Sequence, residues 1–150
     1  MKFSSGLLAA AFLSAGLVAT TSAGPAMVAL SPSALHWVAG TGVSKGTSMA
    51  ILTGDPAKAG TSIIRVKMPD GYVNKPHYHA HPEYITVIQG TLLFGTGDVV
   101  NKSKAQTFPA GSFVAVPAGL HHWSVTQGVT IEQIGGEGPL SNIPIKHGAM

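Results

Sequence analysis

The chain has 150 residues, with nine Lys and Arg against six Asp and Glu, so its formal net charge is only +3. Charged residues make up 10% of the sequence and form no run of one sign, which excludes the basic surface of a nucleic-acid-binding protein. Cysteine is absent, and this excludes thiolate metal sites, iron–sulfur clusters and disulfides.

Residues 1–23 are predicted to form a secretory signal peptide. Lys2 gives a positive start, an uncharged apolar run follows, and small residues precede a cleavage point after Ala23. Ala26 and Ala29 offer later cleavage points, and an amphipathic helix or a membrane anchor is the alternative interpretation. The apolar run is shorter than the roughly 20 residues that span a bilayer. We therefore expect a secreted or periplasmic protein with no stable membrane insertion.

The mature chain, residues 24–150, is of a length that fits one domain, and its pattern predicts an all-β fold. Short apolar or alternating runs recur between Gly- and Pro-containing turns, which is typical of a β-sandwich or small barrel. We expect an extended arm at residues 24–33, a helical turn or loop at 101–105, and irregular structure from 135 to 150. The predicted strands are residues 35–38, 48–52, 61–68, 84–88, 91–95, 112–116, 122–126 and 129–134.

A cluster of histidines lies within residues 71–90. His77, His79 and His81 occupy alternate positions, and Glu83 follows two residues later. Alternate side chains of an extended segment share a face, so His77 and His79 can converge on one point with Glu83 on the same side. Imidazoles with a carboxylate suit a divalent transition metal. The alternative is a polar surface loop that is rich in histidine.

Two motifs in this part of the chain resemble those of the cupin superfamily. The first runs from Gly71 to Gly90 and reads Gly, five residues, His-x-His, three residues, Glu, six residues, Gly. The second runs from Gly111 to His122 and reads Gly, five residues, Pro-x-Gly, two residues, His. Thr126 stands where the family usually has asparagine. The 20 residues between the motifs resemble the short spacing of small single-domain bacterial cupins.

The resemblance is closest over residues 61–134 and implies a jelly-roll β-barrel with a metal inside its mouth. The turn at residues 95–98, Gly-x-Gly-Asp, is similar to one in a group of exported bacterial cupins that has no settled activity. The resemblance also implies a metal site with positions left open for water or substrate. Its ligands would be His77, His79, Glu83 and His122. Manganese, iron(II), nickel, copper and zinc all suit such a set.

For function, the resemblance implies a metal-dependent enzyme of small-molecule metabolism, of dioxygenase, decarboxylase or isomerase type. The alternatives are a non-catalytic periplasmic cupin that binds a small ligand or the metal itself, and a metal-free structural barrel. His81 is a candidate acid or base in the pocket. Arg65 either clamps an anionic substrate or is a solvated strand residue. A homodimer formed through sheet edges is a further expectation.

The remaining histidines and aromatic residues are assigned by alternation and position. His121 neighbours His122 and should face the opposite way, either on the surface or against a ligand residue, and His36 and His147 are expected to be structural or exposed. One of Glu132 and Gln133 must point inward, and Gln133 is the candidate partner of a ligand histidine. Trp123 should face away from the metal. Core positions are expected for Tyr72, Tyr84, Phe94, Phe113 and Trp123.

Overall fold

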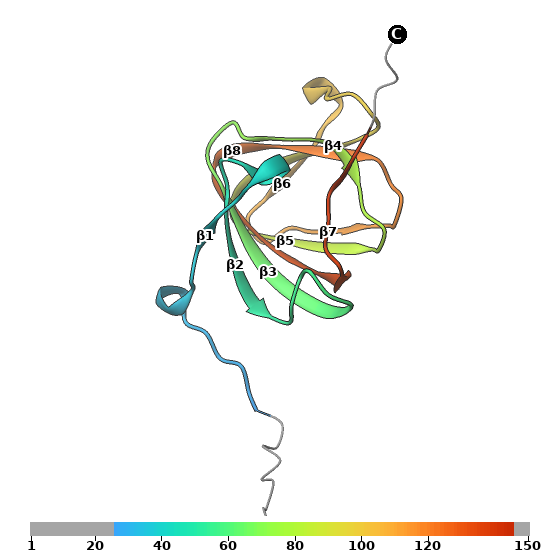
Figure 1. Cartoon of the computed structure of the whole chain (residues 1–150). Helices are drawn as coiled ribbons and strands as arrows, with labels where there is room; N and C mark the ends of the chain where they lie inside the picture. Colours follow the sequence, from blue (N-terminus) through green and yellow to red (C-terminus); the bar gives the residue numbers. More distant parts are fainter. Residues whose placement is uncertain (1–25, 146–150) are drawn as a thin grey trace, which may run out of the picture.

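The fold is all-β, as the sequence predicts. The computed structural model describes residues 26–145, which Figure 1 shows as strands of a sheet that curls round an interior. These residues contain no α-helix, and none of their helices is long and apolar enough to cross a membrane. The signal-peptide prediction for residues 1–23 and the interpretation of His147 lie outside the described residues. The strands are β1 Val38–Ala39, β2 Ser48–Thr53, β3 Gly60–Met68, β4 Val73–Tyr78, β5 Glu83–Thr96, β6 Gln106–Pro109, β7 Phe113–Val116, β8 His122–Gly138 and β9 Ile143–Pro144, and the 3-10 helices are η1 Pro32–Ala34, η2 Gly42–Ser44 and η3 Lys102–Lys104.

Strand β8 is the element around which the sheet is arranged. It has 17 residues and pairs antiparallel with β3 along its second half, with β4 along its first half, and with β5 along most of its length. β1 and β2 extend the sheet beyond β3, β9 pairs with β4, and β6 and β7 pair with β5. One strand therefore brings together segments that lie far apart in the sequence, and these segments carry the two histidine motifs (Figure 1).

The observed strands differ from the predicted ones: β4, β6 and β9 were not predicted, β1 is Val38–Ala39 instead of residues 35–38, and two pairs of predicted strands are merged. The predicted strands 84–88 and 91–95 are one strand, β5, and 122–126 and 129–134 are also one strand, β8. Gly90 and Gly128 have φ values of 76° and 72°, and the register of β5 shifts between Gln89 and Thr91, so these positions bend a strand without ending it. The prediction of irregular structure from residue 135 is wrong for the end of β8, which continues to Gly138. The predicted helical turn at 101–105 is present as η3.

The inner faces of β3, β5, β7 and β8 form the core. Alternate residues of β5 and β8 point inward, as period-2 strands require. The buried apolar cluster comprises Ile64, Ile85, Val87, Leu92, Phe94, Val116 and Ile134. Thr126, which replaces the usual asparagine of the second motif, is 2% exposed; its hydroxyl donates to the carbonyl oxygen of Pro69 at 2.6 Å and accepts from the backbone N–H of Tyr72 at 2.9 Å. This threonine thus ties the turn between β3 and β4 to β8.

The expected core positions of the aromatic residues are correct in part. Trp123 is 1% exposed and packs over Gly95 of β5, and Phe94 belongs to the core. The prediction of a core position is wrong for Tyr84 and Phe113, because their side chains are 50% and 60% exposed. The two rings stack on each other with their centroids 6.4 Å apart. The reason is alternation: Ile85 faces inward, so Tyr84, the preceding residue of β5, faces outward, and Phe113 lies on the same outer face of β7.

Candidate metal centre

Three histidines meet where β4 and β8 lie side by side. His77 is on β4, directly opposite His122 at the start of β8, and His79 follows β4 immediately. All three are buried, and one ring nitrogen of each lies within 4.8 Å of the others. The ring centroids are 4.3 Å apart for His77 and His122, 4.9 Å for His77 and His79, and 5.0 Å for His79 and His122. The structure therefore brings together the histidines that the two motifs predict.

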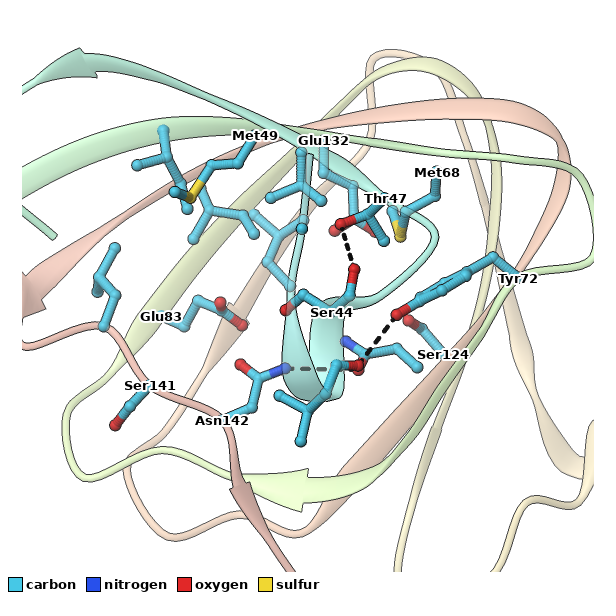
Figure 2. Close-up of a pocket in the computed structure, with 18 of the residues that line it drawn as sticks. Ser44, Thr47, Met49, Met68, Tyr72, Glu83, Ser124, Glu132, Ser141 and Asn142 are labelled. Atoms are coloured by element: carbon cyan, nitrogen blue, oxygen red, sulfur yellow. Dashed lines mark hydrogen bonds between the residues drawn. The ribbon is translucent and has the colours of Figure 1, made fainter. Parts of the chain in front are cut away.

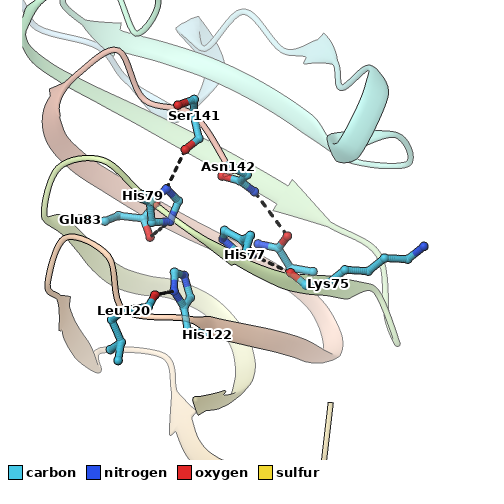
Figure 3. Close-up of polar contacts among 9 residues, drawn as sticks. Lys75, His77, His79, Glu83, Leu120, His122, Ser141 and Asn142 are labelled. Carbon is cyan, nitrogen blue, oxygen red and sulfur yellow. Dashed lines mark hydrogen bonds and ion pairs between the residues drawn. The ribbon is translucent and has the colours of Figure 1, made fainter. Parts of the chain in front are cut away.

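Backbone carbonyl groups hold all three rings in place (Figure 3). Nδ1 of His77 donates to the carbonyl oxygen of Lys75 at 2.6 Å, and Nδ1 of His122 donates to that of Leu120 at 2.9 Å. Nδ1 of His79 donates to the carbonyl oxygen of Ser141 at 3.0 Å. Because a carbonyl can only accept, each Nδ1 carries the hydrogen, and in the neutral ring Nε2 keeps its lone pair. Metal-binding histidines are oriented in this way.

Glu83 lies beside His79 at the start of β5. Its Oε2 is 3.1 Å from Nε2 of His79, and the two side chains are almost fully buried. This contact is an ion pair when Nε2 of His79 carries a proton. When only Nδ1 carries a hydrogen, the Nε2 lone pair and the carboxylate face each other as two electron donors, so the pair needs a cation, which is either a proton on Nε2 or a metal ion.

Burial sets the charge state of the site. Burial lowers the pKa of His77 to about 4 and lowers the pKa of His122, so both rings are neutral near pH 7. Burial also acts to lower the pKa of His79, but the adjacent Glu83 carboxylate outweighs it and holds that pKa above its usual value. Two neutral imidazoles and a third that is paired with a carboxylate fit a divalent metal ion.

A cavity of about 560 Å³ opens beside these residues (Figure 2). Its walls come from β3, β5 and β8, from residues 38–47 around η2, and from residues 140–142 after β8. Most of the wall is apolar, with side chains such as Met49, Met68 and Phe94. Glu83 and His122 lie in the same lining, so the cavity reaches the candidate metal centre. Its volume lies in the range of small-molecule binding sites.

Glu132 is the second carboxyl group of this cavity. It lies in the middle of β8, is 5% exposed, and its Oε1 has no hydrogen-bond partner. Burial, with a smaller contribution from the charge of Glu83, raises the pKa of Glu132 to about 8. Glu132 is therefore the member of the pair Glu132 and Gln133 that points inward.

Gln133 and Arg65 lie on the outer face of the sheet. Nε of Arg65 donates to Oε1 of Gln133 at 3.2 Å, and neither residue lines the cavity. The expectation that Gln133 contacts a ligand histidine is therefore wrong. Arg65 is likewise not a clamp for an anionic substrate in this cavity. In both cases the side chain lies on the face of its strand opposite to the inward-facing neighbours Ile64 and Ile134.

The other histidines lie outside the cluster. His81 is exposed and does not line the cavity, so the structure does not bring it to the site as a pocket acid or base. His121 is partly exposed; its Nδ1 contacts Oδ1 of Asp98 at 2.6 Å, and its ring stacks on Tyr78. His121 thus faces away from the cluster, as the alternation predicts, and His36 is exposed.

Several groups of the site were not found from the sequence. The chain after β8 passes the histidines, where Ser141 supplies a carbonyl group and Asn142 lines the cavity. Nδ2 of Asn142 also donates to Oδ1 of Asn74 at 3.4 Å, which joins this segment to β4. A backbone carbonyl leaves no trace in the residue type, so no sequence signal could have identified it. Glu132 had a signal, since alternation along the strand requires one of Glu132 and Gln133 to point inward.

Comparisons with known proteins agree with this fold. The model of a family described as a domain of unknown function, DUF4437, matches residues 26–141. Germin-like protein subfamily 3 member 2 from Arabidopsis thaliana is 33% identical over 79 residues, which are 51% of this chain and 35% of that protein. The aligned region thus spans about a third of the length of this curated relative.

Solved structures show the same architecture at low sequence identity. An RmlC-like cupin from Shewanella frigidimarina has a TM-score of 0.57 and 16% identity over 72% of this chain and 87% of that one. The polyketide cyclase RemF from Streptomyces resistomycificus has a TM-score of 0.63 and 16% identity over 83% of this chain and 87% of that one. At these identities the likeness concerns the fold alone.

Proposed function

The chain belongs to the DUF4437 family and to the cupin superfamily, and from this premise we propose that it is a divalent-metal-dependent enzyme of small-molecule metabolism. The proposed chemistry is of dioxygenase, decarboxylase or isomerase type. The observation that carries the proposal is the set of three Nδ1–carbonyl hydrogen bonds, which leaves Nε2 of each ring as the nitrogen available to a metal, with His79 and His122 in the cavity lining. Three histidines without a metal would have no need of this common orientation.

The proposed metal ligands are His77, His79, Glu83 and His122. A divalent ion bound there would polarise an oxygen of the substrate as a Lewis acid. The protein itself would supply the apolar walls, which exclude water and strengthen polar contacts inside the cavity. Tyr72 and Ser124 also line the cavity, and the Tyr72 hydroxyl donates to the carbonyl oxygen of Val43 at 3.2 Å. That bond fixes the segment around η2 over the cavity.

Metal content is the direct test of the ligand set. His79→Ala should lose most of its bound metal, because it removes a buried ligand and leaves Glu83 without its partner. The measurement is elemental analysis of purified protein, with circular dichroism to show that the barrel is folded. His81→Ala is the matched control, since this exposed histidine lies two residues away and should leave the metal in place. A full complement of metal in His79→Ala would refute the ligand set.

A second candidate function is a binding protein without turnover, which takes up a small ligand or the metal. The apolar side chains of the lining favour this alternative, because they would hold a ligand without taking part in proton transfer. Oxygen uptake and product analysis with catechols, β-diketones and oxalate would separate the two functions. Turnover that His79→Ala abolishes supports the enzyme, whereas binding of these compounds without turnover supports the binding protein.

We further propose that the protein is exported and acts in the periplasm or outside the cell. The support is the sequence of residues 1–23, with its positive start, apolar run and small residues before Ala23. Assembly as a homodimer through a sheet edge is also a proposal. Sedimentation or light scattering on the purified mature protein would test it.

A further inference from the structure

The carboxyl group of Glu132 is a buried polar group that the metal site does not use. Glu132 lies ten residues after His122 on β8, opposite Val66 of β3 on one side and Val87 of β5 on the other. Neither valine can form a hydrogen bond with it, and its Oε1 has no partner in the part of the chain that the structure describes. Burying such a group without a partner costs on the order of 1–3 kcal/mol. A structural residue at this position would be expected to be apolar.

The side chain of Glu132 lies in the wall of the cavity, with Oε1 itself buried. Glu132 lines the cavity together with Glu83, and Figure 2 draws both among its walls. Val66 and Met68 of β3 and Ile85 of β5 lie in the same lining, so the surroundings of Glu132 are apolar. A ligand that fills the cavity from the metal centre is therefore the partner that this carboxyl group lacks.

The charge of the cavity restricts what such a ligand can be. Among the described residues, no lysine or arginine lines the cavity, and its carboxyl groups are Glu83 and Glu132. An anionic group away from the metal would meet no cationic side chain, so its charge would be buried without a partner. The raised pKa of Glu132 means that its carboxyl group is mostly protonated at neutral pH and can donate a hydrogen bond.

We propose that Glu132 is a second anchor of the binding site, where its carboxyl group donates a hydrogen bond to a neutral oxygen of the ligand. The ligand class is a mainly apolar molecule with oxygen donors at the metal end and a carbonyl or hydroxyl oxygen at the Glu132 end. This inference rests on the proposed metal-dependent function. It assigns specificity to Glu132: the site selects neutral molecules over those with a second anionic group.

The test uses three catechols that differ at one ring position. Calorimetric titration of the zinc-loaded protein would compare catechol, 3,4-dihydroxyacetophenone and 3,4-dihydroxybenzoate. The ketone should bind up to about tenfold more tightly than catechol, as expected for one added hydrogen bond in a buried site. The benzoate should bind more weakly than the ketone, because its carboxylate has no cationic partner.

Two variants separate a hydrogen-bonding role from a packing role. Glu132→Gln keeps a donor of similar shape and should keep the preference for the ketone, whereas Glu132→Leu should lose it while still binding catechol. Glu137→Leu is the control on the same strand, because Glu137 is exposed and contacts Thr61 outside the cavity. Thermal melts and zinc content of each variant show that the barrel and the metal site are intact.

The outcomes distinguish this inference from the function on which it rests. An unchanged preference for the ketone in a folded, zinc-loaded Glu132→Leu variant would overturn the role of Glu132 alone. Equal binding of the three probes to the native protein, or no binding of any of them, would also overturn the role of Glu132. Retention of metal in His79→Ala would instead overturn the metal site itself.

Discussion

At the scale of single residues, the backbone decides what each histidine can do. The carbonyl oxygens of Lys75, Leu120 and Ser141 accept the Nδ1 hydrogens, so Nε2 is the nitrogen of each ring that is available to a metal. The histidine spacing in the sequence supplies the rings but does not fix their tautomers. A change at any of these three positions would affect the site only if it moved the main chain, since the side chains do not make the contact.

Glu132 gives a pH-dependent prediction at the same scale. Its pKa is about 8 in the folded protein against 4.5 for the free side chain. Between these pH values the unfolded chain has lost the proton that the folded chain retains, so the free energy of unfolding falls as pH rises. The slope for one proton is about 1.4 kcal/mol per pH unit. Below pH 4.5 both states are protonated, and the effect disappears.

Glu132→Gln removes this titration. The variant should gain free energy of unfolding relative to the native protein as pH rises from 5 to 8. Urea unfolding at several pH values measures the difference, and the comparison cancels the titration of Glu83 and the histidines that face the same cavity. Parallel pH profiles for the two proteins would show that Glu132 is not protonated in the folded state.

At the scale of elements, the close packing of β5 on β8 depends on one glycine. Gly95 lies opposite Trp123, and a Cβ at this position would overlap the indole ring. Trp123 is 1% exposed, so the ring has no free space into which it can move. Gly95→Ala should therefore lower the free energy of unfolding by about 1–3 kcal/mol.

Gly135→Ala is the matched control for that prediction. It lies on β8, and the nearest atom to an added Cβ is Cγ1 of Ile63 at 3.8 Å, an ordinary contact. We expect it to change the free energy of unfolding by less than about 0.5 kcal/mol. Chemical denaturation of both variants provides the comparison. Equal effects of the two substitutions would mean that contact with Trp123 does not limit the size of residue 95.

At the scale of the whole molecule, the segment that follows β8 completes the site. β9 pairs with His77 and Tyr78 of β4, and the residues before it carry the carbonyl group that orients His79. The cavity walls are thus drawn from residues 38–47, from the central strands and from residues 140–142. The cavity is complete only when residues 38–47 and 140–142 have packed against the sheet.

Export is the prediction that concerns the complete chain. Cleavage of the predicted signal peptide should give a mature protein that begins at Gly24, with Pro25 next. Mass spectrometry of protein recovered from the periplasm or the culture medium of a bacterial host would identify the first residue. A start at Met27 or Leu30 would indicate cleavage after Ala26 or Ala29 instead. Recovery of the intact chain from the cytoplasm would contradict the prediction of export.

The sequence alone determined the all-β class, the cupin resemblance and the three histidines. These follow from local spacing: alternation fixes which neighbours share a face, and the motifs fix the distance between turns. Alternation from His122 also places Glu132, ten residues later on β8, on the inner face. The inward positions of β5, in contrast, change parity at Gly90, from Ile85 and Val87 to Leu92 and Phe94, and local spacing does not predict this shift.

Only the tertiary structure decided the contacts that orient and surround the histidines. The carbonyl group of Ser141 reaches His79 across 62 positions of sequence, and carbonyl groups are the same in every residue type. The absence of lysine and arginine from the cavity lining is likewise a property of the assembled walls. Arg65 lies between Ile64 and Val66, which both line the cavity, yet its own side chain is on the other face of the sheet. Local spacing places a side chain on its strand, but only the packing of distant strands determines what it meets.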